Sequence, residues 1–212
     1  MKTEIESILR TGDWRRLEAE ARANPRVLDA LIRALYLPEE DLAWRAAEGF
    51  GRAVAALAGI EEELCRNRMR RLFWALNDES GTSGRLVAPA VGEAVARAPE
   101  IFGENALILL NVLDEPYLQA GVAWAFGRIG SVRPDLVRET VPEILPLLQS
   151  ADPAVRGHAA WALGEIGAAE AVADLKALAD DAGSVKIYIN GQITETTVGK
   201  LAAAAAAKLE EA

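Results

Sequence analysis

Side chains that could perform chemistry are few in this chain of 212 residues. It contains one histidine, His158, and one cysteine, Cys65. Neither lies in a spacing typical of a catalytic triad, a zinc site or a phosphate-binding loop. Because catalysis needs several reactive side chains close together, the sequence indicates no catalytic, cofactor-binding or metal-binding residue. The question of enzyme activity stays open, but a non-catalytic protein is favoured.

Cys65 has a structural and a functional interpretation, and His158 has an expected location. Cys65 lies at the edge of an apolar helical stripe, which predicts a small core residue. The neighbouring Arg66 and Arg68 could activate a thiol, but no base accompanies them. We expect His158 on the surface or in a groove.

The chain has one basic run, made of Arg66, Arg68, Arg70 and Arg71. One interpretation is a phosphate or nucleic-acid patch. The other is a solvated helix face, since Glu62 precedes Arg66 by four residues. A net charge of −9 and a pI of about 4.8 favour the second, because nucleic-acid binders are usually basic. Nucleic acid is therefore not an expected partner.

Acidic residues recur where helices would begin. One interpretation is an acidic edge for a cationic partner or for Ca²⁺, and the other is that each acid caps its own helix. These residues are Glu39, Glu40, Asp41, Asp78, Glu79, Asp114, Glu115, Asp152, Asp180 and Asp181.

The elements that would position these residues repeat along the chain. Four stretches, 41–54, 83–96, 116–130 and 153–167, align on a glycine. The aligned glycines are Gly51, Gly92, Gly127 and Gly164, which are 41, 35 and 37 residues apart. This is the period of a two-helix repeat, and its small residues let neighbouring helices approach closely.

The clearest copy, DPAVRGHAAWALGEIG at 152–167, resembles the HEAT repeat in its short variety, the PBS-lyase HEAT-like repeat. Asp152, Pro153, Val155 and Arg156 match the family's D-P-x-V-R opening of the second helix of each pair. The resemblance covers roughly residues 26–212. It implies an all-α fold, a right-handed α-solenoid of about five helix pairs, and is specific for fold more than for function.

We expect one domain over 1–212, with capping helices at 1–24, repeats at 25–183, a β-hairpin insertion at 184–197 and a last helix at 197–212. The first helices of the pairs are predicted near 26–35, 60–77, 101–113, 140–149 and 169–181. The second helices are predicted near 39–56, 84–98, 116–131, 153–167 and 197–211.

The hairpin is predicted from Asn190-Gly191, which suits a two-residue turn between β-rich runs. That turn places Lys186 opposite Glu195 and Tyr188 opposite Ile193.

Three positions relative to the aligned glycine, −7, −3 and +1, are predicted to form the exposed face of each second helix. In HEAT-like folds these helices line the concave surface. At position +1 the charge alternates along the repeats, and Lys208 of the last helix continues the alternation. At position −3, Trp124 and Trp161 should lie roughly 10 Å apart and form the base of one apolar patch. The alternative is that the rings fill gaps over alanine. The candidate partner-binding residues are Trp44, Glu48, Arg52, Arg85, Glu93, Trp124, Arg128, His158, Trp161 and Glu165.

The leading functional prediction is a non-catalytic scaffold that binds a peptide or protein segment on this concave groove. The resemblance also implies an alternative, a bilin or tetrapyrrole lyase-like or chromophore-handling factor, and less strongly a nucleic-acid repair protein. No apolar window reaches ~18 residues, and Glu4 and Glu6 lie where a signal peptide would be apolar. We therefore expect a cytoplasmic protein without membrane contact.

Overall fold

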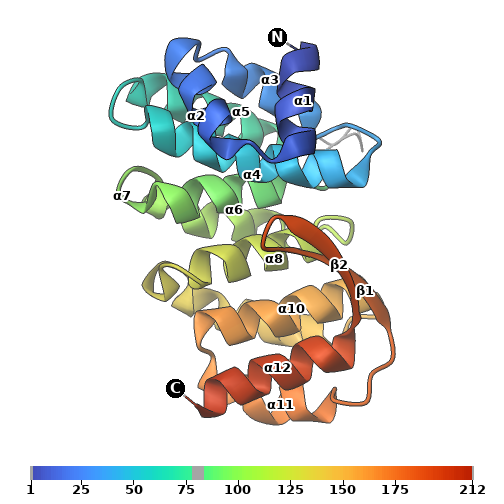
Figure 1. Cartoon of the computed structure of the whole chain (residues 1–212). Helices are drawn as coiled ribbons and strands as arrows, with labels where there is room; N and C mark the ends of the chain where they lie inside the picture. The colour runs from blue at the N-terminus through green and yellow to red at the C-terminus, as the bar shows by residue number, and fades with distance from the viewer. Residues whose placement is uncertain (1, 78–83, 212) are drawn as a thin grey trace. The chain divides into compact units, whose positions relative to one another are not determined.

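The computed structural model describes residues 2–77 and 84–211 (Figure 1). Most of these residues are helical, and the sheet found among them has two antiparallel strands. Contacts along the chain divide it into two compact units, Met1–Gly103 and Glu104–Ala212, which are described separately below. The handedness, the number of repeats and the single domain expected from the sequence stay predictions.

The first unit contains seven helices among its described residues. They are α1 (Lys2–Thr11), α2 (Trp14–Ala23), α3 (Val27–Ala34), α4 (Glu40–Leu57), α5 (Glu62–Leu76), α6 (Val87–Arg97) and α7 (Pro99–Phe102). The two helices expected before residue 24 are therefore present. Asp13 caps α2 by accepting a hydrogen bond from the Arg16 main-chain N–H at 3.1 Å. Both α1 and α2 pack on α4, where Gly49 lies against leucines of the first three helices, so they cover the start of the repeats.

The second unit alternates α-helices with short 3₁₀ segments. Its elements are η1 (Gly103–Val112), α8 (Gln119–Gly130), η2 (Pro134–Leu136), η3 (Arg138–Thr140), α9 (Val141–Ile144), η4 (Leu145–Gln149), α10 (Pro153–Ile166), η5 (Ala169–Ala171), α11 (Val172–Ala177), β1 (Ser184–Ile189), β2 (Gln192–Thr197) and α12 (Val198–Glu210). The first helices expected at 101–113 and 140–149 are largely 3₁₀. Pro146 accounts for part of the difference, because proline lacks the N–H that an α-helix would use there.

The second helices of the pairs form where predicted, as α4, α6, α8, α10 and α12. Within the units α4 packs on α6, α8 on α10, and α10 on α12. Three of the aligned glycines, Gly51, Gly127 and Gly164, lie at these contacts. A Cβ added at Gly51 would lie 2.6 Å from the carbonyl carbon of Glu93, and one at Gly164 would lie 2.7 Å from Ala205 Cβ. Side chains at these positions would push the helices apart, which explains the repeated glycine.

The hairpin forms as predicted. Strands β1 and β2 pair with Lys186 opposite Glu195 and Tyr188 opposite Ile193. The turn residues have positive φ, 53° at Asn190 and 81° at Gly191, as a type I′ turn requires. Strand β1 packs on α10 and β2 on α12, so the hairpin lies against the last two of these helices (Figure 1).

Candidate functional site

An aromatic cluster lies on the second-helix face of the second unit. The ring of Trp124 stacks on that of Trp161, with 5.9 Å between centroids and 25° between planes. Tyr188 of β1 lies 6.4 Å from Trp124, whose indole N–H donates to the Tyr188 carbonyl oxygen at 2.8 Å. Trp124 is 2% exposed and Trp161 is half-buried. Trp161 is therefore partly exposed to solvent, whereas Trp124 lies beneath the hairpin.

Two expectations about this pair are corrected. Trp124 was expected to be exposed, but β1 covers it. The two rings were expected roughly 10 Å apart, but they are in contact. The reason for the shorter distance is Gly127: a Cβ there would lie 2.5 Å from Trp161 Cζ3, so its absence makes room for the Trp161 ring against α8.

The predicted exposed residues of the first unit are mostly buried. Trp44, Glu48 and Glu93 are 8%, 6% and 3% exposed, so their predicted exposure is wrong. The physical reason for the carboxylates is a network of ion pairs. Arg52 contacts Glu18 at 3.6 Å and Glu48 at 2.8 Å, and Arg97 contacts Glu48 at 3.2 Å and Glu93 at 2.7 Å. Buried carboxylates are tolerated when paired in this way.

His158 is also buried, at 5% exposed, against the expectation of a surface or groove position. Its Nδ1–H donates to the carbonyl oxygen of Ala154 at 2.8 Å, which leaves Nε2 as the acceptor. In the part of the chain that the structure describes, Nε2 has no hydrogen-bond partner. Burial lowers the pKa of His158 to about 4, although the Ala154 bond and Asp152 act in the other direction.

The remaining candidates are accessible. Glu165 pairs with Lys208 at 2.7 Å, which confirms the predicted neighbouring charges of α10 and α12. Arg128 is half-buried and donates to Ser131 Oγ at 3.1 Å. Arg85 is exposed in the first unit. The structure therefore brings Trp161, Arg128 and Glu165 together on α8 and α10, and not the whole predicted set.

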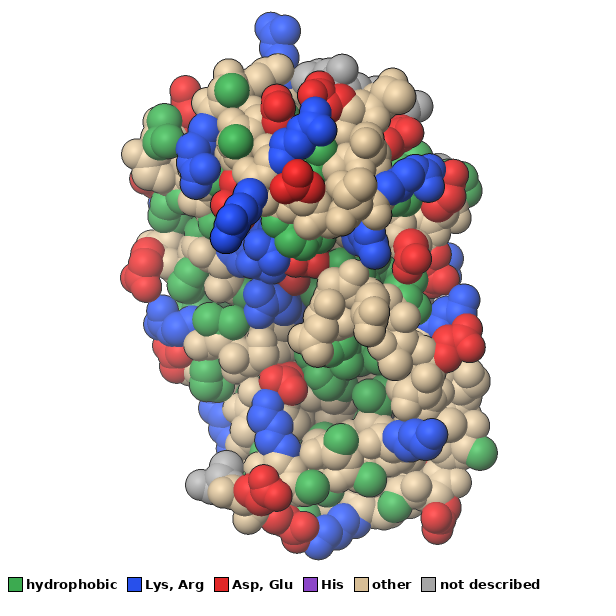
Figure 2. Space-filling view, viewed as in Figure 1, with side chains coloured by type: hydrophobic (Ala, Val, Ile, Leu, Met, Phe, Trp, Pro, Cys, Tyr) green, Lys and Arg blue, Asp and Glu red, His purple; other side chains and the backbone are tan. Residues whose placement is uncertain are grey.

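The basic run is neutralised within the first unit. Arg66 pairs with Glu62, Arg70 with Glu63, and both Arg68 and Arg71 with Asp29. Burial raises the pKa of Asp29, but its bonds to the two arginines outweigh this and leave the pKa below its usual value. Figure 2 shows basic and acidic side chains intermixed over the face in view. These contacts favour the interpretation as a solvated, ion-paired helix face. Asp29 was not singled out from the sequence, because its partners lie 39 and 42 residues away.

Cys65 is buried in the core of the first unit. Burial, with Glu61 nearby, raises the pKa of its thiol to about 11, so the thiol is uncharged at neutral pH. This supports its interpretation as a core residue.

Two acids of the predicted acidic edge bind main-chain N–H groups. Asp152 caps α10 through the Ala154 N–H at 2.8 Å, and Asp181 accepts from the Gly183 N–H at 2.8 Å. Asp78 and Glu79 lie outside the described residues. Within 2–77 and 84–211, no group of three or more His, Cys, Asp or Glu residues is placed to hold a metal ion.

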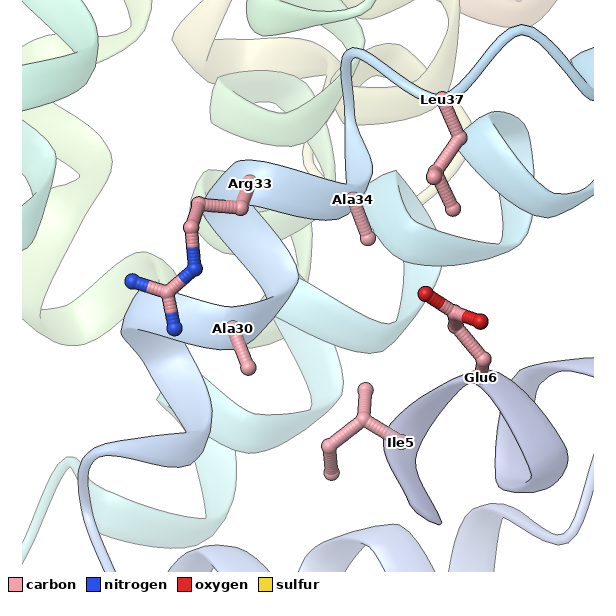
Figure 3. Close-up of a pocket in the computed structure, with 6 residues that line it drawn as sticks. All are labelled: Ile5, Glu6, Ala30, Arg33, Ala34 and Leu37. Carbon is pink, nitrogen blue, oxygen red and sulfur yellow. The ribbon is translucent and has the colours of Figure 1, made fainter. Parts of the chain in front are cut away.

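A small cavity of about 130 Å³ lies between α1 and α3 in the first unit. Figure 3 shows apolar side chains at its centre, with Glu6 of α1 and Arg33 of α3 on opposite sides. Sequence reasoning did not find it, since the two helices carry no motif that pairs them. Its lining is Ile5, Glu6, Ala30, Arg33, Ala34 and Leu37.

The packed helix pairs, with glycine at each contact, define a helical repeat protein. Residues 105–187 match the family of HEAT repeats, which confirms the resemblance to HEAT-like repeat proteins. HEAT repeats are helical scaffolds that generally mediate protein interactions. None of the described helices has the length and apolar character needed to span a membrane.

Two similar proteins extend this comparison. An uncharacterized protein of Archaeoglobus fulgidus is 34% identical over 113 residues, which are 53% of this chain and 56% of that protein, so the match spans about half of the relative's length. The crystal structure of an engineered protein has a TM-score of 0.57 and 16% identity, covering 98% of this chain and 97% of its own. At that identity the likeness supports the fold alone.

Proposed function

We propose that this protein is a non-catalytic scaffold that binds a peptide or protein segment on the second-helix face of its second unit. The observation that carries the proposal is the half-buried Trp161, which stacks on the buried Trp124. Large aromatic side chains over a packed floor are typical centres of protein interfaces. Arg128 and Glu165 lie one helical turn beyond the two tryptophans on α8 and α10, where they would orient the partner.

The hairpin supports this choice of face. Strand β1 is an extended segment lying on α10, and its Tyr188 carbonyl accepts the Trp124 N–H. The face therefore already binds one extended segment, strand β1, through the hydrogen bond from the Trp124 indole N–H. In this proposal the partner segment lies on the same face and covers the rest of Trp161. The buried residues Trp124 and His158 then support the surface from beneath. The candidates Trp44, Glu48, Arg52, Arg85 and Glu93 belong to the first unit and are not part of the proposed surface.

The proposed partner is a cytoplasmic protein. A chain with one buried cysteine forms no internal disulfide, which fits a reducing compartment. The ion-paired arginines and the charge of −9 argue against nucleic acid as the partner.

The test is quantitative capture of partners from the native cell with wild type, Trp161→Ala and Trp74→Ala, followed by affinity measurement on the captured protein. Trp74 on α5 is 82% exposed and provides a matched control. Loss of a central aromatic residue costs ~2 kcal/mol or more, so Trp161→Ala should weaken binding at least ~30-fold. Equal binding by a folded Trp161→Ala variant, or loss of binding only with Trp74→Ala, would contradict the proposal.

A further inference from the structure

The turn of the hairpin determines which main-chain groups face outward. In a two-residue turn, the flanking residues Ile189 and Gln192 exchange hydrogen bonds, and such pairs alternate along the ladder. Residues 193 and 195 therefore direct their N–H and C=O groups away from β1. Two observed bonds fit this alternation: Val198 N–H donates to the Gly183 carbonyl within the ladder, and the Tyr188 carbonyl points outward to Trp124.

The two outer edges of the hairpin differ in what covers them. On β1, Val185, Ile187 and Tyr188 are at most 3% exposed, and Tyr188 is bonded to Trp124. On β2, the side chain of Glu195 is 73% exposed. For the main-chain groups of Ile193 and Glu195 the described part of the chain supplies no hydrogen-bond partner. We call these four groups the β2 edge.

We propose that the β2 edge binds an extended strand of a protein partner by antiparallel strand addition. Two residues of the incoming strand would each exchange two hydrogen bonds with Ile193 and Glu195, as in other cases of β-augmentation. Edge strands are usually protected by charged side chains, lysine above all, by proline or by a bulge. Strand β2 has Glu195 as its one charged residue, no lysine and no proline, and its six residues pair one to one with β1, without a bulge.

Charge selects the chemistry of the incoming strand. The only ion pair recorded for Glu195 in the described structure is with Lys186 at 3.9 Å, the outer limit of such contacts. A basic residue opposite Glu195 would complete its pairing from the other side, and an apolar residue would match Ile193. In an antiparallel strand the residue opposite Glu195 comes first, so the expected motif is basic–any–apolar. A second copy of β2 would instead place Glu195 opposite Ile193 and near the other Glu195, which is unfavourable.

The probe for this proposal is the peptide acetyl-Thr-Lys-Thr-Val-Thr-amide, titrated to millimolar concentration against the full chain and followed by NMR. We expect chemical-shift changes centred on residues 192–197. The same peptide N-methylated at its valine lacks one ladder donor and should bind at least ~10-fold more weakly. This proposal does not rest on the Trp161 surface, so Trp161→Ala should leave the peptide affinity unchanged.

Variants of the protein complete the test. Glu195→Pro removes an outward N–H and the charge but no main-chain hydrogen bond of the hairpin, and should weaken binding at least ~10-fold. Glu195→Lys should weaken binding about 3-fold and should reverse the preference toward a peptide with glutamate in place of lysine. Thr194→Val, whose main chain faces β1, is the matched control and should bind as wild type.

Several results would overturn the proposal. These are no binding at millimolar peptide, undiminished binding of the N-methylated peptide, or undiminished binding by Glu195→Lys. Chemical-shift changes centred on Trp161 would show that the peptide binds at the Trp161 surface instead. Dimerisation of the wild type that Glu195→Pro abolishes would identify a second copy as the occupant. Should Glu195→Pro unfold the hairpin, the N-methylated peptide and Glu195→Lys still decide the outcome.

Discussion

The indole N–H of Trp124 donates a 2.8 Å hydrogen bond to the main-chain carbonyl of Tyr188, 64 residues further along the chain. This bond joins α8 to the hairpin near its turn. At the other end of the hairpin, Asp181 pairs with Arg156 of α10 at 2.8 Å. The hairpin is therefore held at both ends and belongs to the packed structure of the second unit.

Trp124→Phe should destabilise the protein while keeping an aromatic ring in the stack. The substitution removes the donor to a buried carbonyl, which typically costs ~1–3 kcal/mol. The free energy of unfolding from urea titration measures the loss. Trp74→Phe, at an exposed position, should change it by less than ~0.5 kcal/mol. Equal unfolding midpoints for Trp124→Phe and wild type would show that the bond contributes nothing.

Gly127→Ala tests the close approach of α8 and α10. The new Cβ would lie 2.5 Å from Trp161 Cζ3 and 2.9 Å from the Ala162 Cα, so one helix must shift. Overpacking of this kind costs ~1–3 kcal/mol, measured by thermal or urea unfolding. Gly59→Ala is the control, because nothing lies within 4 Å of its added Cβ. If both variants unfold alike, the aligned glycine has no spacing role.

Local signals explain which parts of the fold could be predicted. The Asn190-Gly191 turn depends on two residues, and their positive φ angles follow from residue type. The cap of α10 by Asp152 is equally local. These features were read correctly because no distant segment decides them.

The burial of the candidate site could not be predicted in this way. Trp124 and Trp161 lie at equivalent repeat positions, but the first is covered by a strand from residue 188 and the second is not. Glu48 was assigned to an exposed face by its −3 position relative to the aligned glycine, yet Arg97, 49 residues away, pairs with it. Both outcomes depend on tertiary contacts that a repeat alignment leaves out.

Glu48→Ala should be markedly destabilising. Glu48 is 6% exposed and accepts from Arg52 and Arg97, and its removal takes a charged acceptor from both. We expect a loss of about 2 kcal/mol in the free energy of unfolding. Glu62→Ala breaks the exposed pair with Arg66 and should cost at most ~1 kcal/mol. A similar small loss for both variants would contradict a structural role for the buried network.

His158 predicts a specific dependence of stability on pH. Its pKa is about 4 in the folded protein, below the ordinary 6.5, because burial disfavours the charged imidazole. As pH falls through 6.5, the unfolded chain binds a proton at His158 that the folded chain does not. The contribution of His158 to the free energy of unfolding is therefore fully present above pH 6.5, declines between pH 6.5 and about 4, and is lost below that.

His158→Gln removes this titration, so the comparison of the two proteins isolates it from the carboxylates that also titrate near pH 4. The difference in free energy of unfolding between wild type and variant should shift by up to ~3 kcal/mol from pH 7 to pH 4, to the disadvantage of wild type. Urea titrations at intervals of half a pH unit measure it. Parallel stability curves for the two proteins across this range would mean that His158 is equally accessible to protons in both states, which contradicts its burial against Ala154.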